Sequence, residues 1–317
     1  MRALARIGRP SKRGPRNALV ALWSCLAASL LLAACASTGG QHVPQVGAAQ
    51  GRDLRPVTTL SRPAEITVMT LNIAHARRDG FHQLLQTTSE AIDNLDAIGR
   101  LLLERAPDIV ALQEADGSSF WNGDFDHVAY LAEHGAFRHH VRGEHVRAPR
   151  LAYGTALLSA VELRDPLTVT FQPGLSPLPK GFLVSTFHWP QRPDLAVDVV
   201  SLHLDPVNPS VRRRQAGELI AALRTRGHPT IMMGDFNAEW SARSSAVRLI
   251  AETLNLKAYR PEQAAMDTFP ALGRRLDWIL VSPHFDFLSH HTLTEPVSDH
   301  RGVVARLRLA LPATGSL

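Results

Sequence analysis

The feature that most constrains the fold is the placement of isolated polar residues at the ends of short apolar runs. Four of them lie at or near the C-terminal end of a run: Asn72, Glu114, His203 and Asp235. Two others lie at the start of a run: Asp277 and His300. Short apolar runs bounded by turn residues are typical of buried β-strands. If all these residues meet at one rim, some strands must run opposite to others, which predicts mixed β-sheets.

Helical patterns alternate with the strand-like runs, which indicates an α/β fold. The predicted strands are 66–73, 108–113, 155–159, 197–204, 230–234, 275–281 and 303–309. The predicted helices are 91–105, 211–223 and 244–254, and Pro107 marks the end of the first. Residues 172–181 are rich in Pro and Gly and are predicted to form a loop. Residues 64–312 are expected to form one domain of roughly 250 residues, with a short tail over 313–317.

The net charge of +5 is carried by the beginning of the chain. The first 35 residues contain six basic side chains and no acidic one. Without that segment, 28 of the 34 Lys and Arg remain against 29 Asp and Glu, a net charge of −1. The rest of the chain therefore has no overall electrostatic preference for polyanions such as nucleic acids.

The same 35 residues have the order of an export signal. A basic region ends at Arg16, and an apolar stretch over 18–34 follows that is short for a membrane span. The run Leu32-Ala33-Ala34-Cys35 resembles a bacterial lipobox. That resemblance implies cleavage before Cys35 and its lipidation, which would anchor the protein to a membrane of the bacterial cell envelope. The alternatives are a plain signal peptide or an uncleaved anchor.

Residues 36–63 are rich in Gly, Gln, Pro, Ser, Thr and Ala and are expected to form a flexible tether. Cys25 would leave with the signal, and Cys35 would then be the only cysteine, so no internal disulfide can form. We expect a monomer.

Taken one at a time, the polar residues have ordinary explanations. Asn72 can cap a turn, His203 can be a half-buried hydrogen-bonded histidine, and Asp235 with Asn237 can form an Asx turn. As a set, these polar residues combine metal ligands with groups for acid–base chemistry. Asn72, Glu114 and Asp299 provide the oxygen ligands that Mg²⁺ and Mn²⁺ prefer. Histidines with acidic partners can supply a base and a hydrogen-bond donor.

Six short segments make this set specific. They are Thr70-Leu71-Asn72-Ile73, Ala111-Leu112-Gln113-Glu114, Ser201-Leu202-His203-Leu204, Gly234-Asp235-Phe236-Asn237, Arg275-Leu276-Asp277 and Ser298-Asp299-His300. Their order resembles that of the endonuclease/exonuclease/phosphatase superfamily, across residues 66–309. The resemblance implies a four-layer sandwich, in which two mixed β-sheets lie face to face and are flanked by helices, with the active site at one rim.

The resemblance also implies roles for these residues. Glu114 is expected to be the principal metal ligand, with Asn72 and Asp299 close by. Asp277 is expected to orient His300, which assists the attacking hydroxide. Asp235 and Asn237 are expected to position the water and the phosphate. His203 is expected to stabilise charge on the phosphoryl oxygens.

Other positions extend the resemblance less firmly. Tyr153 is expected to contact phosphate, although Thr155 stands where many members have Asn. Thr268 is expected to support the rim. The arginines at 212–214 are expected to form a solvated helix face. Two histidine groups, His139, His140 and His145, and His290 and His291, are expected at the surface or in loops, while the stretch 138–150 could touch substrate phosphate.

These expectations define a metal-dependent phosphoesterase acting on a phosphodiester or a phosphomonoester. The alternatives are a nuclease acting on DNA or RNA outside the cytoplasm, and a sphingomyelinase-like phospholipid hydrolase. A non-catalytic relative would need a missing key residue, and none is missing. A serine hydrolase is disfavoured because the sequence contains no G-x-S-x-G element.

Overall fold

The described part of the protein covers most of the predicted domain. The computed structural model describes residues 40–42, 45–48, 65–78, 80, 86–174, 178–263 and 266–310. The predicted signal with Cys35 and the predicted tail lie outside these residues. None of the described helices is both long and apolar enough to cross a membrane.

The described strands form two seven-stranded sheets. The first has the order β1 (Gly40–His42), β7 (Arg164–Thr170), β8 (Gly181–Trp189), β9 (Arg192–His203), β10 (Thr230–Asp235), β12 (Asp277–Val281) and β11 (Lys257–Ala258). The second has the order β13 (Phe285–Thr292), β14 (Val303–Leu309), β3 (Glu65–Asn72), β4 (Ile109–Asp116), β6 (Leu151–Ser159), β5 (His139–Ala148) and β2 (Gln45–Ala48).

Both sheets are mixed, as the placement of the polar residues predicts. In the first sheet β10 runs parallel to β9 and antiparallel to β12, and in the second β3 runs parallel to β4 and antiparallel to β14. The ends of β9 and β10 and the start of β12 therefore lie at one edge. The same holds in the second sheet for the ends of β3 and β4 and the start of β14.

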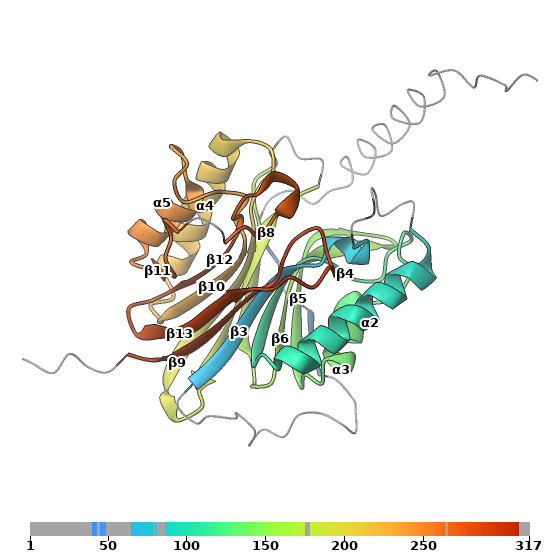
Figure 1. The fold of residues 1–317 in the computed structure, drawn as a ribbon, viewed down its shortest axis with the longest axis horizontal. Helices are drawn as coiled ribbons and strands as arrows, with labels where there is room; N and C mark the ends of the chain where they lie inside the picture. The colour runs from blue at the N-terminus through green and yellow to red at the C-terminus, as the bar shows by residue number, and fades with distance from the viewer. Residues whose placement is uncertain are drawn as a thin grey trace, which may run out of the picture.

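The helices and sheets stack in four layers (Figure 1). Three apolar cores lie between these layers. The central core lies between the sheets and joins residues such as Val68 and Leu157 to Phe187, Val199 and Ile231. A second core packs α4 (Pro209–Arg224) and α5 (Ala246–Thr253) on the first sheet. A third packs α2 (Thr88–Arg105) and α3 (His127–His134) on the second sheet. The predicted four-layer sandwich is confirmed.

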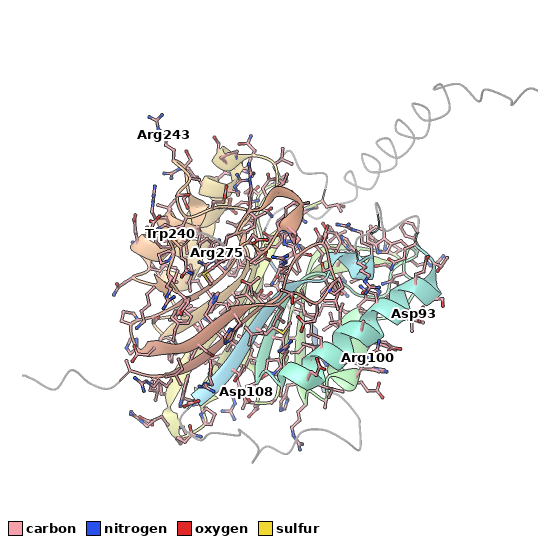
Figure 2. The ribbon with its side chains drawn as sticks, viewed as in Figure 1. Asp93, Arg100, Asp108, Trp240, Arg243 and Arg275 are labelled. Atoms are coloured by element: carbon pink, nitrogen blue, oxygen red, sulfur yellow. The ribbon has the colours of Figure 1, made fainter. Side chains whose placement is uncertain are left out.

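The longest helix shows how local sequence sets the boundaries. The predicted helix over 91–105 begins three residues earlier, because Thr87 and Glu90 form a reciprocal capping box that satisfies free backbone donors at the N-terminus. The exposed Asp93 and Arg100 lie on its solvent side (Figure 2). Helix α3, which the apolar pattern did not indicate, is only eight residues long and is capped by Asp126.

The segment expected to be a tether contains two short strands. Residues 40–42 pair with β7 and residues 45–48 pair with β5, so each sheet gains an edge strand from residues 36–63. Edge pairing uses backbone groups that every residue carries, and composition therefore does not reveal it.

Candidate active site

The polar residues at the strand ends converge on one oxygen atom, Oδ2 of Asp235. The Asn72 amide Nδ2 donates to it at 3.2 Å. His203 Nε2 lies 3.4 Å from it and His300 Nε2 lies 3.8 Å from it. All four side chains are buried. Asn72 ends β3 and His300 lies just before β14, both in the second sheet, while His203 and Asp235 end β9 and β10 of the first, so the site spans the edges of both sheets.

Strand register places the members that come from the first sheet. Asp235 pairs with His203 across the parallel neighbour and with Asp277 across the antiparallel neighbour. Gly234 precedes Asp235 with φ of 150°, and a Cβ built there would lie 2.0 Å from the Leu202 carbonyl oxygen. Only glycine therefore allows β10 to approach β9 this closely just before Asp235.

Asn237 sits in a tight turn beside Asp235. Its backbone N–H donates to Asp235 Oδ1 at 2.9 Å, which is the Asx turn that the sequence allows. Its side-chain amide donates to the Leu204 carbonyl at 3.0 Å, and its φ is 48°. These two hydrogen bonds fix the backbone at the C-terminal end of β10.

His300 forms a hydrogen bond with Asp277, the residue that is predicted to orient it. His300 Nδ1 donates to Asp277 Oδ2 at 2.9 Å. The Thr268 hydroxyl accepts the backbone N–H groups of Leu276 and Asp277 at 2.9 and 3.0 Å, so Thr268 supports this rim. Phe269 packs against the His300 ring at a centroid distance of 4.9 Å.

Burial and charge set the protonation of this cluster. Burial raises the pKa of Asp235 to about 7; the charge of His300 opposes that rise and the Asp277 carboxylate reinforces it. Burial opposes the charged form of His300, but the two carboxylates outweigh it and raise its pKa to about 10. Burial lowers the pKa of His203 well below its usual value, so His203 is a neutral donor and acceptor.

Glu114 lies on a β-bulge in β4. The register of β4 against β6 shifts between Gln113 and Ala115, and Glu114 has φ of 50°. A positive φ in a residue other than glycine is strained and occurs most often where function requires it. Glu114 Oε1 accepts a hydrogen bond from Lys180 Nζ at 3.2 Å. Burial opposes ionisation of Glu114, but nearby cations, Lys180 first, lower its pKa well below its usual value.

The structure adds residues that the sequence patterns did not indicate. His75 Nε2 lies 3.6 Å from Glu114 Oε2, and His75 Nδ1 donates to Asp116 Oδ1 at 2.6 Å. The Trp121 indole donates to the other Asp116 oxygen at 2.7 Å. His75 lies in the one-turn helix η1 (Ala74–Ala76), whose three residues all have positive φ. The signal in the sequence was only that His75 and Asp116 stand next to the Asn72 and Glu114 segments.

Asn72 and Asp299 lie in the same region but have different hydrogen-bond partners. Asn72 Oδ1 accepts the backbone N–H of Ala74 at 3.0 Å, and the Ser298 hydroxyl donates to the Asn72 carbonyl at 2.6 Å. Asp299 Oδ2 pairs with Arg77 at 2.8 Å. The charge of Arg77 also helps to lower the pKa of Glu114.

Tyr153 is buried beside this group. Its ring meets the His75 ring edge-on at 5.2 Å, and its hydroxyl donates to the Pro179 carbonyl at 3.1 Å. In this state the Tyr153 hydroxyl holds the loop before β8, and burial with the charge of Glu114 raises its pKa well above its usual value.

The prediction that His145 and His290 lie at the surface or in loops is wrong. His145 is on β5, is 1% exposed, and lies 3.1 Å from the Thr155 hydroxyl. His290 is on β13, is 7% exposed, and stacks on Tyr259. Polar alternation along a strand does not distinguish a solvent face from a face covered by another layer. His139, His140 and His291 are also on strands and are not buried.

The donor set fits a hard divalent cation. Glu114, Asn72 and Asp299 offer oxygen atoms, the ligand type that Mg²⁺ and Mn²⁺ prefer. The group of carboxylate and histidine ligand atoms that lie within 4.8 Å of one another among the described residues is a different one, formed by Asp235, Asp277 and His300, and it includes neither Glu114 nor Asp299. Asp277 Oδ1 is buried without a hydrogen-bond partner among the described residues, and a cation or an ordered water would satisfy it.

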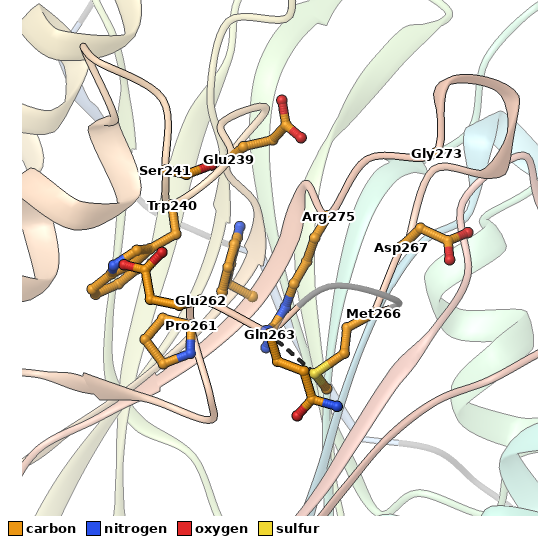
Figure 3. Close-up of a pocket in the computed structure, with 11 residues that line it drawn as sticks. Glu239, Trp240, Ser241, Pro261, Glu262, Gln263, Met266, Asp267, Gly273 and Arg275 are labelled. Atoms are coloured by element: carbon orange, nitrogen blue, oxygen red, sulfur yellow. Dashed lines mark hydrogen bonds between the residues drawn. The ribbon is translucent and has the colours of Figure 1, made fainter.

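A pocket of about 370 Å³ adjoins the Asp235–Asn237 segment along the chain (Figure 3). Trp240 lies on one side and Met266 on the other, with Arg275 between them. The Arg275 guanidinium stacks over the Trp278 ring at 3.9 Å. The pocket therefore combines an aromatic wall with a buried cation.

Comparison with known proteins places the chain in a family. Residues 69–300 match the model of the Endonuclease/Exonuclease/phosphatase family. A search among proteins of curated function found no significant match. Three similar structures, each less than 25% identical to this chain, share its fold.

One is an endonuclease/exonuclease/phosphatase from Beutenbergia cavernae, 23% identical, with a TM-score of 0.63 over 78% of this chain and 72% of the other. Another is a mannosyl-6-phosphatase from Bacteroides thetaiotaomicron, 16% identical, with a TM-score of 0.56 over 76% and 99%. The third is the human Nocturnin catalytic domain, 19% identical, with a TM-score of 0.51 over 84% and 97%. With 232 of its residues matched by the family model, the chain belongs to the endonuclease/exonuclease/phosphatase family.

Proposed function

We propose that the protein is a divalent-metal-dependent phosphoesterase that hydrolyses a phosphate ester by attack of an activated water at phosphorus. Members of its family are generally hydrolases, phosphatases and nucleases among them. The observation that carries the proposal is the convergence of Asn72, His203 and His300 on one oxygen of Asp235. Such a buried array of donors around a carboxylate can hold both a water and a phosphoryl group.

Each residue has a role that its contacts support. Asp235 accepts a hydrogen bond from the attacking water and takes its proton. His300, held by Asp277, directs Nε2 toward the same place and stabilises negative charge there. His203 donates to a phosphoryl oxygen. A divalent cation, Mg²⁺ or Mn²⁺, held by Glu114 with Asn72 and Asp299 would neutralise the charge that develops on those oxygens.

The arginines of residues 138–150 argue for a small phosphate ester over a nucleic acid. A nucleic-acid track needs free positive charge along the backbone path. Here three arginines pair with carboxylates: Arg142 with Asp126 and Glu144, Arg147 with Glu144, and Arg150 with Asp124. The stretch therefore offers little charge to a polyanion. The pocket with Trp240 and Arg275 has the size for the organic part of a small ester.

The proposal is tested with the purified protein and Mg²⁺, Mn²⁺ or Ca²⁺. The substrates are nitrophenyl phosphate, bis-nitrophenyl phosphate, sugar and inositol phosphates, sphingomyelin, RNA and plasmid DNA. We expect metal-dependent hydrolysis of a small ester, with rates reduced at least about 100-fold in Glu114→Ala and His300→Ala. The control is Asp286→Ala, whose carboxylate pairs with Lys257 on the outer strands β11 and β13.

Unchanged rates in both site variants would refute the site. Cleavage of DNA or RNA in preference to every small ester would favour the nuclease alternative. Preference for sphingomyelin would favour the phospholipid hydrolase.

A further inference from the structure

Lys180 is a buried cation at the centre of the site that neither the motifs nor the roles above include. It directly precedes β8, and its side chain is 6% exposed. The backbone around it is fixed, because the Lys180 carbonyl accepts the N–H of Phe171 and the Pro179 carbonyl accepts the Tyr153 hydroxyl. In register, the next residue, Gly181, pairs with His203.

The ammonium group has a single hydrogen-bond partner among the described residues. Lys180 Nζ donates to Glu114 Oε1 at 3.2 Å, while an ammonium group carries three donors. After burial, the charge of Lys180 is the strongest influence on the pKa of Glu114 and of His203, and it lowers both. The hydrogen bond to Glu114 and the pairing of the next residue with His203 place Lys180 beside both the expected metal ligand and the strand that carries the expected phosphate donor.

Its one partner is also the carboxylate that the metal needs. A divalent cation and the Lys180 ammonium group compete for Glu114, because both need its negative charge. When Glu114 is committed to the metal, Lys180 is left as a buried cation without an anion, which is strongly unfavourable. The anion that enters this space during the reaction is the phosphate group of the substrate.

We propose that Lys180 is a phosphate-binding residue that pairs with Glu114 while the metal site is empty and donates to a phosphoryl oxygen once the metal is bound. This inference rests on the proposed function of the same site. Arg77 also pairs with an expected metal ligand, Asp299, but it differs from Lys180 because it is more exposed and keeps a second partner, the Gly80 carbonyl. Lys180 thereby makes phosphate binding depend on metal binding.

The test measures metal and phosphate affinity separately by titration calorimetry on the full chain. The variants are Lys180→Met and Lys180→Gln, which remove the charge, and Lys180→Arg, which keeps it. The control is Lys257→Met, because Lys257 forms an ion pair of similar length with Asp286 away from the site, at 3.1 Å against 3.2 Å for Lys180 and Glu114, but at an exposed position. The probes are Mn²⁺ alone, and inorganic phosphate in saturating Mn²⁺.

We expect opposite changes in the two affinities. Without the competing ammonium group, Lys180→Met and Lys180→Gln should bind Mn²⁺ more tightly than the wild-type protein. Without the donor, they should bind phosphate at least about tenfold more weakly, the effect of losing one charge-assisted hydrogen bond. Lys180→Arg should retain phosphate binding, and Lys257→Met should match the wild type in both measurements.

A purely structural ion pair would give a different result. Loss of Mn²⁺ affinity, or phosphate affinity equal to that of the wild type, in a variant with normal circular dichroism would overturn the role of Lys180. Two charge-removing variants guard against loss of folding in one of them. If the wild-type protein itself binds no phosphate and hydrolyses no ester, the proposed function fails, and this result is distinct from a failure of Lys180 alone.

Discussion

At the scale of single residues, several buried groups carry charge or polarity that the core must accommodate. In the site, buried polar side chains form hydrogen bonds with one another, as His75 Nδ1 does with Asp116 Oδ1 at 2.6 Å. His127 differs, because both of its ring nitrogens are buried without a hydrogen-bond partner among the described residues. Burial lowers the pKa of His127 to about 4, although the Asp116 carboxylate opposes the shift. Its neutral form is therefore the one that the fold tolerates.

His127 predicts a loss of stability in mild acid. In the unfolded chain its pKa is about 6.5, so below that pH the unfolded state takes up a proton before the folded state does. Stability from this group is present above pH 6.5 and is lost as the pH falls toward 4. Between pH 7 and 5 the loss is about 2 kcal/mol.

Between pH 7 and pH 5, the free energy of unfolding of His127→Phe should decrease by about 2 kcal/mol less than that of the wild type. Urea denaturation at both pH values measures the difference. Other histidines titrate equally in both proteins and cancel in the comparison. An identical pH dependence in variant and wild type would contradict the assignment.

At the scale of elements, the site depends on backbone conformations that few residues accept. Glu114 at a bulge and the three residues of η1 all have positive φ. These segments hold Glu114 and His75 next to Asn72 at the end of β3. Strand ends thus carry most of the cluster around Asp235, while a bulge in β4 and the one-turn helix η1 carry Glu114 and His75.

Gly234 gives a test at this scale. Gly234→Ala should lower the free energy of unfolding by more than about 2 kcal/mol, because the new Cβ would meet the Leu202 carbonyl oxygen at an unfavourable φ. The matched control is Gly217→Ala in α4, where a Cβ meets nothing within 4 Å. There alanine should stabilise by up to about 1 kcal/mol through helix propensity. Guanidinium denaturation measures both, and equal effects would show that β10 can move away from β9.

At the scale of the whole molecule, the proposed active site lies at the edge where strands of both sheets end, and the proposed anchor lies near the beginning of the sequence. We propose that Cys35 carries lipid and holds the protein, as a monomer, in a bacterial cell envelope. The support is the run Leu32–Cys35 after a basic and then an apolar segment. Residues 40–42 and 45–48 reach the edge strands β7 and β5 of the two sheets.

Cys35→Ser tests the anchor. Without the sulfur there is no site for the lipid, so the variant should leave the membrane fraction and lose incorporation of labelled palmitate. Cys25→Ser, within the segment expected to be removed, is the control and should fractionate like the wild type. A Cys35→Ser protein that stays as firmly bound as the wild type would favour an uncleaved anchor.

The sequence by itself determined the fold class and the six segments of the site. Strand ends and starts are local properties, and the order of the six segments resembles that of a known family, so Asn72, His203, Asp235, Asp277 and His300 could be named before the structure was known. Tertiary structure decided what surrounds them. Lys180 and Glu114 are 66 positions apart, and Asn72 and Asp235 are 163 apart.

Whether a charged side chain is buried, and which partner it meets, depends on how the two sheets pack, and no local pattern records that. This is why His145 was expected at the surface, and why His75, Asp116 and Lys180 were recognised only in three dimensions.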